Sequence, residues 1–527
     1  MRYLDRGLAF ALIQLLAVEF AYGAQAPVVA HLTTGIVAGA QQEGVTAFLG
    51  IPFAAPPVGP NRWRAPRPVR AWQGTRDATH FAASCYQALM PDGFGPWKHE
   101  YVVQGAVSED CLYLNVWTPK ADPKGHLPVL VWIHGGGFTQ GSGSVAVYDG
   151  APLASDGIVV VTFNYRLGVF GFLAHPELTS EAGKGVPPGN FGLQDMIAAL
   201  KWVRQNIEVL GGDPDQVTLD GQSAGAMAIH DLLASPLAAG LFERAIIESG
   251  LPNIGVPHGL AEAERAGEEF QRSRHAASLA ALRALPAAEI LGPSQPSGPR
   301  FGPVVDGVLL PDAPTQIAKS GKFNDTPVMI GMVADEASGL APATYGIADQ
   351  PGFTDLVHKT YGSMAERFQQ FYPATTDAER VEMTHQILRD RGLAGLYAWG
   401  SERLGRSKQP IYVYMFTHVE PGPDSARYAA FHSCEIPYAF RTLDKTPERH
   451  FTAADRSLAH TVSAYWVNFV KTGDPNGHGL ASWSRFDARN PRIMRLDVEA
   501  VAQPMLPQPK LEAVRGFLAQ GGNPSIF

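Results

Sequence analysis

A serine flanked by two glycines is the chain's strongest candidate for covalent chemistry. The segment Gly221-Gln222-Ser223-Ala224-Gly225 follows a short apolar run at 217–219 and precedes a helix-like apolar segment. In that context G-x-S-x-G is typical of a nucleophile elbow, a tight strand-to-helix turn with no room for side chains at its flanking positions. We therefore expect Ser223 to project from a sheet edge as a nucleophile.

A free serine hydroxyl is a poor nucleophile and needs a general base and a site for the oxyanion. The segment His134-Gly135-Gly136-Gly137-Phe138 follows a strand-like run at 129–133. Its glycines allow the backbone to aim several N–H groups at one point, and the N–H of Ala224 supplies another donor. A phosphate-binding loop would continue with Lys-Ser or Lys-Thr, which is absent here. The loop therefore predicts an oxyanion hole.

The base and the acid follow the serine along the chain. In this type of site the order is Ser, then acid, then His. Asp335 and Glu336 come after a strand-like run at 328–330, and composition alone does not choose between them. His432 comes soon after a strand-like run at 411–414. A single histidine is more often a surface or packed residue, so His432 is at this point only a candidate for the base.

The elements that must position these residues alternate between strand and helix. Continuous apolar runs at 129–133 and 158–163 have the length expected of strands buried on both faces. Apolar residues at steps of three and four from Leu193 to Ile207 predict a helix that Gly211-Gly212 ends. Further short strands are expected at 217–219 and 245–247. The succession predicts an α/β fold with a mostly parallel central sheet flanked by helices.

Beyond residue 250 the pattern loosens. Residues 251–325 and 338–409 are rich in Ala, Gly, Pro and charged residues, and indicate helices and loops. Two more strands are expected at 328–330 and 411–414, and a helix at about 454–472. With no internal repeat and no linker, residues 24–527 are expected to form one domain with large insertions.

The first residues are typical of a targeting signal. Arg2 and Arg6 precede an apolar stretch at 8–18, which is too short to span a membrane, and small residues around position 23 offer cleavage sites. We expect a signal peptide at 1–23 and a secreted or periplasmic protein without a membrane span. The net charge of −8, without a long run of one sign, argues against nucleic-acid binding.

Three cysteines are few for 527 residues. In an exported protein Cys85 and Cys111 could pair across a loop of about 26 residues, but two buried thiols would agree with the sequence equally well. The third cysteine, Cys434, lies two residues after His432.

Taken together, these motifs resemble the type-B carboxylesterases, the family of the cholinesterases and the bacterial para-nitrobenzyl esterases. The resemblance runs from about residue 35 to residue 483. Besides the elbow and the glycine-rich loop, it rests on Gly50-Ile51-Pro52-Phe53-Ala54, Glu109-Asp110-Cys111-Leu112-Tyr113-Leu114-Asn115, Asn164-Tyr165-Arg166, Gly189-Asn190-Phe191-Gly192-Leu193 and Gly211-Gly212-Asp213-Pro214.

The resemblance implies an α/β-hydrolase fold and assigns the site residue by residue. It implies Ser223 as nucleophile, Glu336 rather than Asp335 as the acid, and His432 as the base. It places oxyanion donors at Gly136, Gly137 and Ala224, a disulfide between Cys85 and Cys111, and structural ion pairs Arg62–Glu109 and Arg166–Asp195. It implies no metal and no organic cofactor.

Two residues near the site depart from the family pattern or invite another hypothesis. Gln222 stands before the nucleophile where the family usually has Glu, which removes a negative charge and argues against a cholinesterase-like site. Cys434 invites a Cys–His hypothesis, but Ser223 in its elbow is far better supported. Phe138, Trp97 and Tyr345 are candidates for lining a gorge, although ordinary packing would explain each of them.

The resulting hypothesis is a serine carboxylic-ester hydrolase that acts on a small-molecule ester through an acyl-enzyme intermediate. The alternatives are another acyl hydrolase on the same triad (an amidase, a lactonase, or a polyester or toxin esterase) and a non-catalytic binding protein on the esterase fold. The sequence does not choose the natural ester, the stereochemistry or the oligomeric state.

Overall fold

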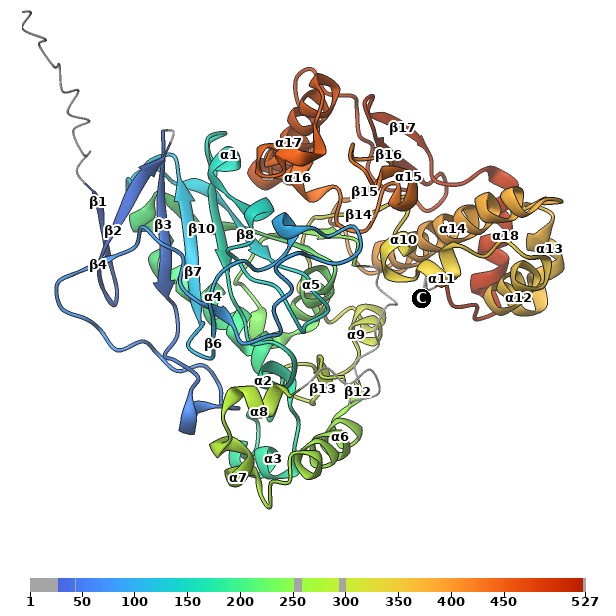
Figure 1. Cartoon of the computed structure of the whole chain (residues 1–527). Coiled ribbons are helices and arrows are strands. Elements are labelled where there is room, and N and C mark those ends of the chain that lie inside the picture. Colours follow the sequence, from blue (N-terminus) through green and yellow to red (C-terminus); the bar gives the residue numbers. More distant parts are fainter. Residues whose placement is uncertain (1–26, 43, 251–257, 293–299, 525–527) are drawn as a thin grey trace, which may run out of the picture.

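One large sheet of thirteen strands runs through the part of the chain described by the computed structural model, which is residues 27–42, 44–250, 258–292 and 300–524 (Figure 1). In spatial order its strands are β1 (Val28–Leu32), β2 (Gly35–Gln42), β3 (Val45–Pro52), β7 (Tyr113–Thr118), β9 (Val159–Phe163), β8 (Leu127–Ile133), β10 (Gly212–Gln222), β11 (Arg244–Glu248), β14 (Val328–Val333), β15 (Ile411–Phe416), β16 (Arg492–Leu496) and β17 (Val501–Pro504), with β4 (Thr75–Asp77) beside β2. Two short pairs stand apart from it: β5 (Ser84–Cys85) with β6 (Val107–Ser108), and β12 (His258–Gly259) with β13 (Val304–Val305).

The centre of the sheet, from β9 to β16, is parallel throughout. Strand β8 shows why its sequence is apolar without interruption. Val129, Val131 and Ile133 pack into one buried cluster, whereas Leu130 and Trp132 pack into another on the opposite face. A strand buried on both faces needs apolar residues at every position. The mostly parallel sheet expected from the sequence is confirmed.

Both edges of the sheet are antiparallel, which the sequence did not reveal. Strands β1, β2, β3, β7 and β9 pair antiparallel at one edge, and β16 pairs antiparallel with β17 at the other. The outermost strands β1 and β17 are partly exposed along their length, so they lack the continuous apolar run that identified the central strands. Strand β10 is also longer than the expected 217–219, and a register shift between Gly212 and Val217 interrupts its pairing with β8.

Helices cover both faces of the sheet and build the insertions (Figure 1). They are α1 (Ala151–Ala154), α2 (Gly168–Phe172), α3 (Pro176–Ala182), α4 (Phe191–Asn206), α5 (Ala224–Ala234), α6 (Leu260–Ser273), α7 (Leu279–Ala284), α8 (Ala287–Leu291), α9 (Pro314–Ser320), α10 (Ala337–Leu340), α11 (Pro342–Tyr345), α12 (Gln350–Tyr361), α13 (Ala365–Gln369), α14 (Asp377–Leu404), α15 (Ser425–Tyr428), α16 (Ile436–Ala439), α17 (Ala453–Thr472) and α18 (Gln508–Ala519). None of the described helices is long and apolar enough to cross a membrane.

Local signals set the ends of the helices that border the site. Helix α17 begins with a capping box between Thr452 and Asp455 and ends at Gly473, whose φ of 75° favours glycine. Helix α4 ends at Asn206, and a 3-10 turn, Ile207–Leu210, continues to Gly211 at φ 90°. The expected helix is therefore correct in position, but its last turn is tighter than an α-helix.

Covalent and ionic links hold the loops around the sheet. Cys85 and Cys111 form a disulfide, as the resemblance implied. The two implied ion pairs are also present: Arg62 Nε lies 2.6 Å from a Glu109 carboxylate oxygen, and Arg166 Nη2 lies 2.7 Å from Asp195. Arg62 also donates to the backbone oxygens of Arg283 and Leu285, so it ties the first insertion to the body of the protein. The expected signal peptide at 1–23 lies outside the described residues.

Candidate active site

Ser223 sits in a strained turn between β10 and α5. Its backbone has φ 58° and ψ −122°, a conformation that a non-glycine residue rarely adopts. Its N–H donates to the backbone oxygen of Glu248 on β11 at 2.9 Å. A Cβ on Gly225 would lie only 1.9 Å from the backbone oxygen of Ile133, so the turn excludes a side chain there. This is the geometry that the G-x-S-x-G pattern predicted.

The glycine-rich loop after β8 packs directly against the elbow. A Cβ on Gly135 would come within 3.0 Å of the Ser223 Cβ, and a Cβ on Gly136 would clash with the backbone oxygen of Gln140 at 2.1 Å. Within the described chain, no hydrogen bond uses the backbone N–H of Gly136, Gly137 or Ala224. Three N–H donors near one serine are therefore free to bind a substrate oxygen.

His134 fixes the start of this loop through its ring and its backbone. Its ring stacks on Tyr165 at 4.3 Å between centroids, and its Nδ1 contacts the backbone oxygen of Gly135. Burial lowers the pKa of His134 to about 4, so the ring is neutral near pH 7. The Tyr165 hydroxyl donates to the His134 backbone oxygen at 2.8 Å, which anchors the loop further.

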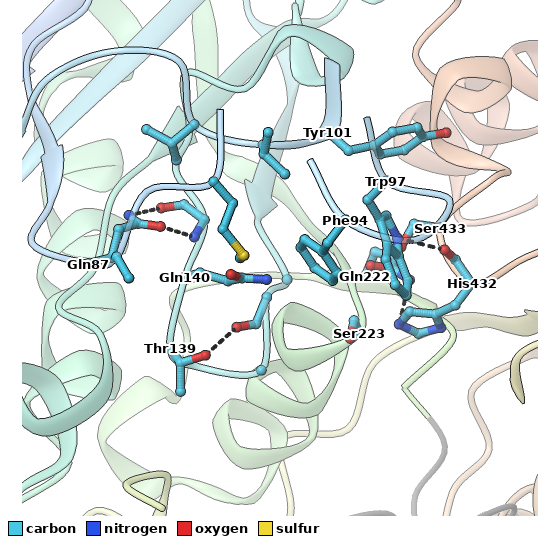
Figure 2. Close-up of a pocket in the computed structure, with 18 of the residues that line it drawn as sticks. Gln87, Phe94, Trp97, Tyr101, Thr139, Gln140, Gln222, Ser223, His432 and Ser433 are labelled. Atoms are coloured by element: carbon cyan, nitrogen blue, oxygen red, sulfur yellow. Dashed lines mark hydrogen bonds between the residues drawn. The ribbon is translucent and has the colours of Figure 1, made fainter. Parts of the chain in front are cut away.

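His432 and Glu336 meet across about a hundred residues of sequence. The Nδ1 atom of His432 forms a short hydrogen bond with the Glu336 carboxylate, and both side chains are buried. The other oxygen of Glu336 accepts the backbone N–H of Val333 at 3.1 Å, which orients the carboxylate. A neutral imidazole that donates from Nδ1 has a lone pair on Nε2, on the side of the pocket (Figure 2).

Asp335, the other acid candidate, belongs to a different set of contacts. Its carboxylate lies 2.7 Å from the Arg389 guanidinium and accepts the Tyr345 hydroxyl at 2.9 Å and the Ala430 N–H at 3.2 Å. These contacts tie the segment before His432 to α14. Asp335 therefore supports the position of the histidine without touching its ring.

Gln222 contacts His432, the candidate base, directly. Its side-chain nitrogen lies 3.1 Å from His432 Nε2 (Figure 2), so the amide N–H donates to the lone pair of the neutral ring. Ser223 is half-buried and lines the same pocket as His432. The nitrogen that would take the serine proton is thus held by a neutral amide.

These residues lie at the base of a cavity of about 290 Å³. The lining includes no Asp, Glu, Lys or Arg among the described residues, and His432 is its only imidazole. One wall comes from the loop closed by the Cys85–Cys111 disulfide, whose Leu89, Met90, Phe94 and Trp97 face the cavity. A cavity without a formal charge and with an apolar wall suits an uncharged ligand.

Of the three aromatic residues considered for the gorge, Trp97 alone lines the cavity. Its indole N–H donates to the His432 backbone oxygen at 3.0 Å. Phe138 packs against Phe172 in the core, and Tyr345 stacks on His385. The sequence could not separate these roles because each aromatic residue lies in a polar or loop-like stretch.

Cys434 is fully buried beside the site. Burial raises the pKa of the Cys434 thiol well above its usual range, and the neighbouring Glu435 carboxyl adds to this effect. A thiol that stays protonated is a poor nucleophile, so the Cys–His hypothesis has no support in the geometry.

Side chains that could hold a metal lie outside the cavity. Donor atoms of His99, Glu100 and Glu448 lie within 4.8 Å of one another in the described structure. Arg449 already contacts Glu100 at 2.7 Å, which neutralises the buried carboxylate of the group. The cluster is explained as a structural ion-pair network.

Comparisons with known proteins agree with this geometry. The sequence pattern of the carboxylesterase family matches residues 25–513. The chain is 40% identical over 487 residues to fumonisin B1 esterase from Sphingopyxis macrogoltabida, covering 88% of this chain and 85% of that protein. It is 35% identical to para-nitrobenzyl esterase from Bacillus subtilis, covering 88% of this chain and 94% of the relative.

Solved structures give the same result. A carboxylesterase from Geobacillus stearothermophilus superposes with a TM-score of 0.77 at 31% identity, covering 92% of this chain and 99% of that one. A para-nitrobenzyl esterase structure gives a TM-score of 0.76 at 32% identity, with the same coverage. The matches to these relatives cover most of both chains and agree with the strained serine and the free N–H donors of the site. The chain therefore belongs to the carboxylesterase family, whose α/β-hydrolase fold and ester-hydrolysing activity it shares.

Proposed function

We propose that Ser223, His432 and Glu336 act as a catalytic triad for the hydrolysis of carboxylic esters. The observation that carries the proposal is the buried His432, held by Glu336 through Nδ1 while Nε2 faces the pocket that Ser223 lines. The carboxylate keeps the imidazole in the tautomer that can accept a proton at Nε2 and stabilises the imidazolium that forms.

The reaction proceeds in two halves. Ser223 Oγ attacks the ester carbonyl as its proton passes to His432, and the oxyanion is bound by the N–H groups of Gly136, Gly137 and Ala224. The imidazolium then protonates the leaving alcohol, and water repeats the sequence to release the acid. Each oxyanion donor contributes roughly 3–4 kcal/mol to transition-state stabilisation in comparable sites.

Gln222 must give up its contact for this step to occur. A neutral imidazole has one lone pair at Nε2, and the Gln222 amide and the Ser223 hydroxyl compete for it. Substrate binding that draws the amide toward the ester, or a small rotation of the imidazole, would release Nε2 to the serine.

We further propose that the enzyme acts on uncharged esters with an apolar part. The cavity has no charged wall, and Leu89, Met90, Phe94 and Leu340 at its lining are 37–46% exposed, so a ligand could bury them. Two relatives are named for fumonisin B1 and para-nitrobenzyl esters, and a human relative, 34% identical over 478 residues, is named for cocaine. Esters of these three kinds are the first substrates to try. The fumonisin B1 relative also gives a toxin esterase as a second candidate function.

The test is a panel of para-nitrophenyl esters, matched para-nitroanilides and the three compounds named above. We expect hydrolysis of the esters, at least a thousandfold slower cleavage of the anilides, and no ester turnover by Ser223→Ala. Cys434→Ala serves as the control, because it alters a buried thiol beside the site and should keep its activity. Full activity in Ser223→Ala would overturn the proposal.

The proposed localisation is secreted or periplasmic, with a signal peptide removed near residue 23 and residues 24–527 forming one domain. The Cys85–Cys111 disulfide supports it, since such bonds persist in oxidising compartments. N-terminal sequencing of the protein recovered from the culture medium or the periplasm should start near residue 24. A mature protein that starts at Met1 would contradict this localisation.

A further inference from the structure

Two acidic side chains lie buried in the sheet directly below the nucleophile. Asp220 is three residues before Ser223 on β10, and Glu248 ends the neighbouring strand β11. Asp220 pairs with Ile246, and Glu248 follows two positions later, so both carboxyl groups project from the same face of the sheet. Both residues are completely shielded from solvent.

The surroundings offer these carboxyl groups very few donors. The indole N–H of Trp466 on α17 donates to one Glu248 oxygen at 2.6 Å. Apart from a contact of Asp220 with the adjacent Gly221 backbone N–H, the other Glu248 oxygen and both Asp220 oxygens meet no donor in the described chain. No described Lys, Arg or His forms an ion pair with either residue. Two adjacent buried carboxylates without a cation would be very unfavourable.

The strand register places the two buried carboxyl groups on the same face of neighbouring strands, where they can reach each other. An ionised carboxylate only accepts, so a hydrogen bond between two carboxyl groups needs a proton on one of them. We propose that Asp220 and Glu248 share one proton in a buried carboxylic acid–carboxylate hydrogen bond, and that this bond positions the nucleophile elbow.

The backbone connects this pair to Ser223. The Glu248 backbone oxygen accepts the Ser223 N–H at 2.9 Å, and this contact holds the serine at its strained φ of 58°. Through its side chain Glu248 is fixed to Asp220 on one side and to Trp466 on the other. Asp220 and Glu248 are thus positioning residues, a role that rests on the proposed function of Ser223, whereas the shared proton does not depend on it.

The other titratable groups around the pair increase its need for a proton. Burial raises the pKa of Asp220 and of Glu248 well above their usual values, and the carboxyl groups of Asp220 and Glu435 raise the pKa of Glu248 further. Glu435 before α16 faces Glu248, and its own pKa is raised to about 8 by burial and by Glu336. Tyr414 on β15 and Tyr148 also face the pair and contribute no positive charge.

Alkaline pH should therefore destabilise the site. Folding raises the pKa of both carboxyl groups, so the folded protein retains a proton that the unfolded chain releases above about pH 4. The free energy of unfolding falls as the pH rises from there toward the folded-state pKa. Above it, two negative charges would face each other below the elbow.

The decisive variants are Asp220→Asn and Asp220→Val, with Thr218→Val as the matched control. The Asn amide can donate to Glu248 without a titrating proton, whereas Val removes the bond. Thr218 lies two residues earlier on the same strand and face, is also buried, and has a hydroxyl without a partner among the described residues.

The first measurement is the infrared band of a protonated carboxyl group at pH 7, taken as the difference between wild type and each variant. We expect a carboxylic acid band in the wild-type-minus-Asp220→Asn spectrum and none for Thr218→Val. A wild-type spectrum that matches Asp220→Asn would overturn the shared proton, whatever the role of Ser223.

The second measurement is Tm and kcat between pH 5 and pH 9.5. We expect the Tm of the wild type to fall toward alkaline pH. The Tm of Asp220→Asn should fall much less, and its kcat should stay within threefold of wild type. Asp220→Val should lose at least tenfold in kcat at pH 7. Equal kcat in the Asn and Val variants would overturn the positioning role. If Asp220→Val does not fold, the pH profile of Asp220→Asn decides, and a profile unchanged from wild type contradicts the proposal.

Discussion

Asp335 and Glu336 are neighbours in the chain, yet their carboxylates serve different parts of the molecule. Glu336 bonds to the His432 ring, whereas Asp335 bonds to Arg389, Tyr345 and the Ala430 backbone. In the proposed mechanism, Glu336 orients the base and Asp335 anchors the segment that carries it.

Substitution should separate these two roles. Glu336→Gln keeps the shape of the side chain but removes the charge that stabilises the imidazolium, so kcat should fall by about 10³–10⁴-fold with little change in Tm. Asp335→Asn weakens a buried ion pair, so Tm should fall while kcat at low temperature stays within tenfold of wild type. Steady-state kinetics and thermal melts of both variants are the measurement. The reverse pattern would assign the acid to Asp335.

Gln222 permits a second prediction at this scale. The Gln222→Glu carboxylate would accept a hydrogen bond from a protonated His432, so it would favour the charged ring over the neutral one. We expect the acidic limb of the kcat profile to move to higher pH, with little change on the alkaline side. An unchanged acidic limb would mean that Gln222 does not contact the base during turnover.

At the scale of elements, the sequence predicted those strands and helices that have a continuous or periodic apolar pattern. The strands near 129–133, 158–163, 328–330 and 411–414 and the helix near 454–472 are present with slightly different ends. The edge strands, such as β1 and β17, escaped because half of their positions face solvent. Helix α14 lies in the region where helices and loops were expected, but its bounds were not predicted because its buried residues occur all around it, from Ile387 to Leu396.

The same distinction applies to the site. The turn at Ser223 and the loop after β8 each need glycines because the backbone approaches other atoms closely there. Such a requirement falls on neighbouring residues, so a short sequence motif reveals it. The partners of Asp335, the contact of Gln222 with His432, and the pairing of Asp220 with Glu248 depend on segments that are distant in sequence. No periodicity records those contacts.

The loop between Cys85 and Cys111 is the element whose role is easiest to test. It carries Leu89, Met90, Phe94 and Trp97 to the cavity and is closed by the disulfide. Replacing both cysteines by Ala should lower the free energy of unfolding by about 3–4 kcal/mol on a chain-entropy account. Because the wall then loosens, KM should rise more than kcat falls. Unchanged Tm and KM would contradict this role.

At the scale of the whole molecule, the cavity is built from parts that the fold brings together from separate regions. The disulfide-closed loop, the glycine-rich loop after β8, the elbow after β10, Leu340 at the end of α10, and His432 all line it. The sheet supplies the chemistry, and the segments between its strands supply the apolar wall. Substrate choice therefore lies in the segments outside the sheet.

This arrangement predicts that kcat/KM depends on the length of the acyl chain of the ester, because the apolar wall contacts that chain. Leu89 is 45% exposed and Leu340 is 46% exposed, so a long apolar group could bury about half of each side chain. The loss of about 1 kcal/mol per leucine predicts a roughly fivefold lower kcat/KM for a decanoate ester in Leu89→Ser or Leu340→Ser. The acetate ester should change less than twofold, and Val498→Ser, exposed but absent from the cavity lining, should change neither rate. Equal effects on both esters would contradict the account.

The most direct test of the central claim is to locate the covalent adduct of an organophosphonate probe. Such a probe reacts with a serine that is activated by a base and faces an oxyanion hole. The account predicts one adduct per chain, on the peptide that contains Ser223, with loss of ester hydrolysis in proportion to labelling, and no adduct in Ser223→Ala. An adduct on another residue, or full labelling of Ser223→Ala, would contradict it.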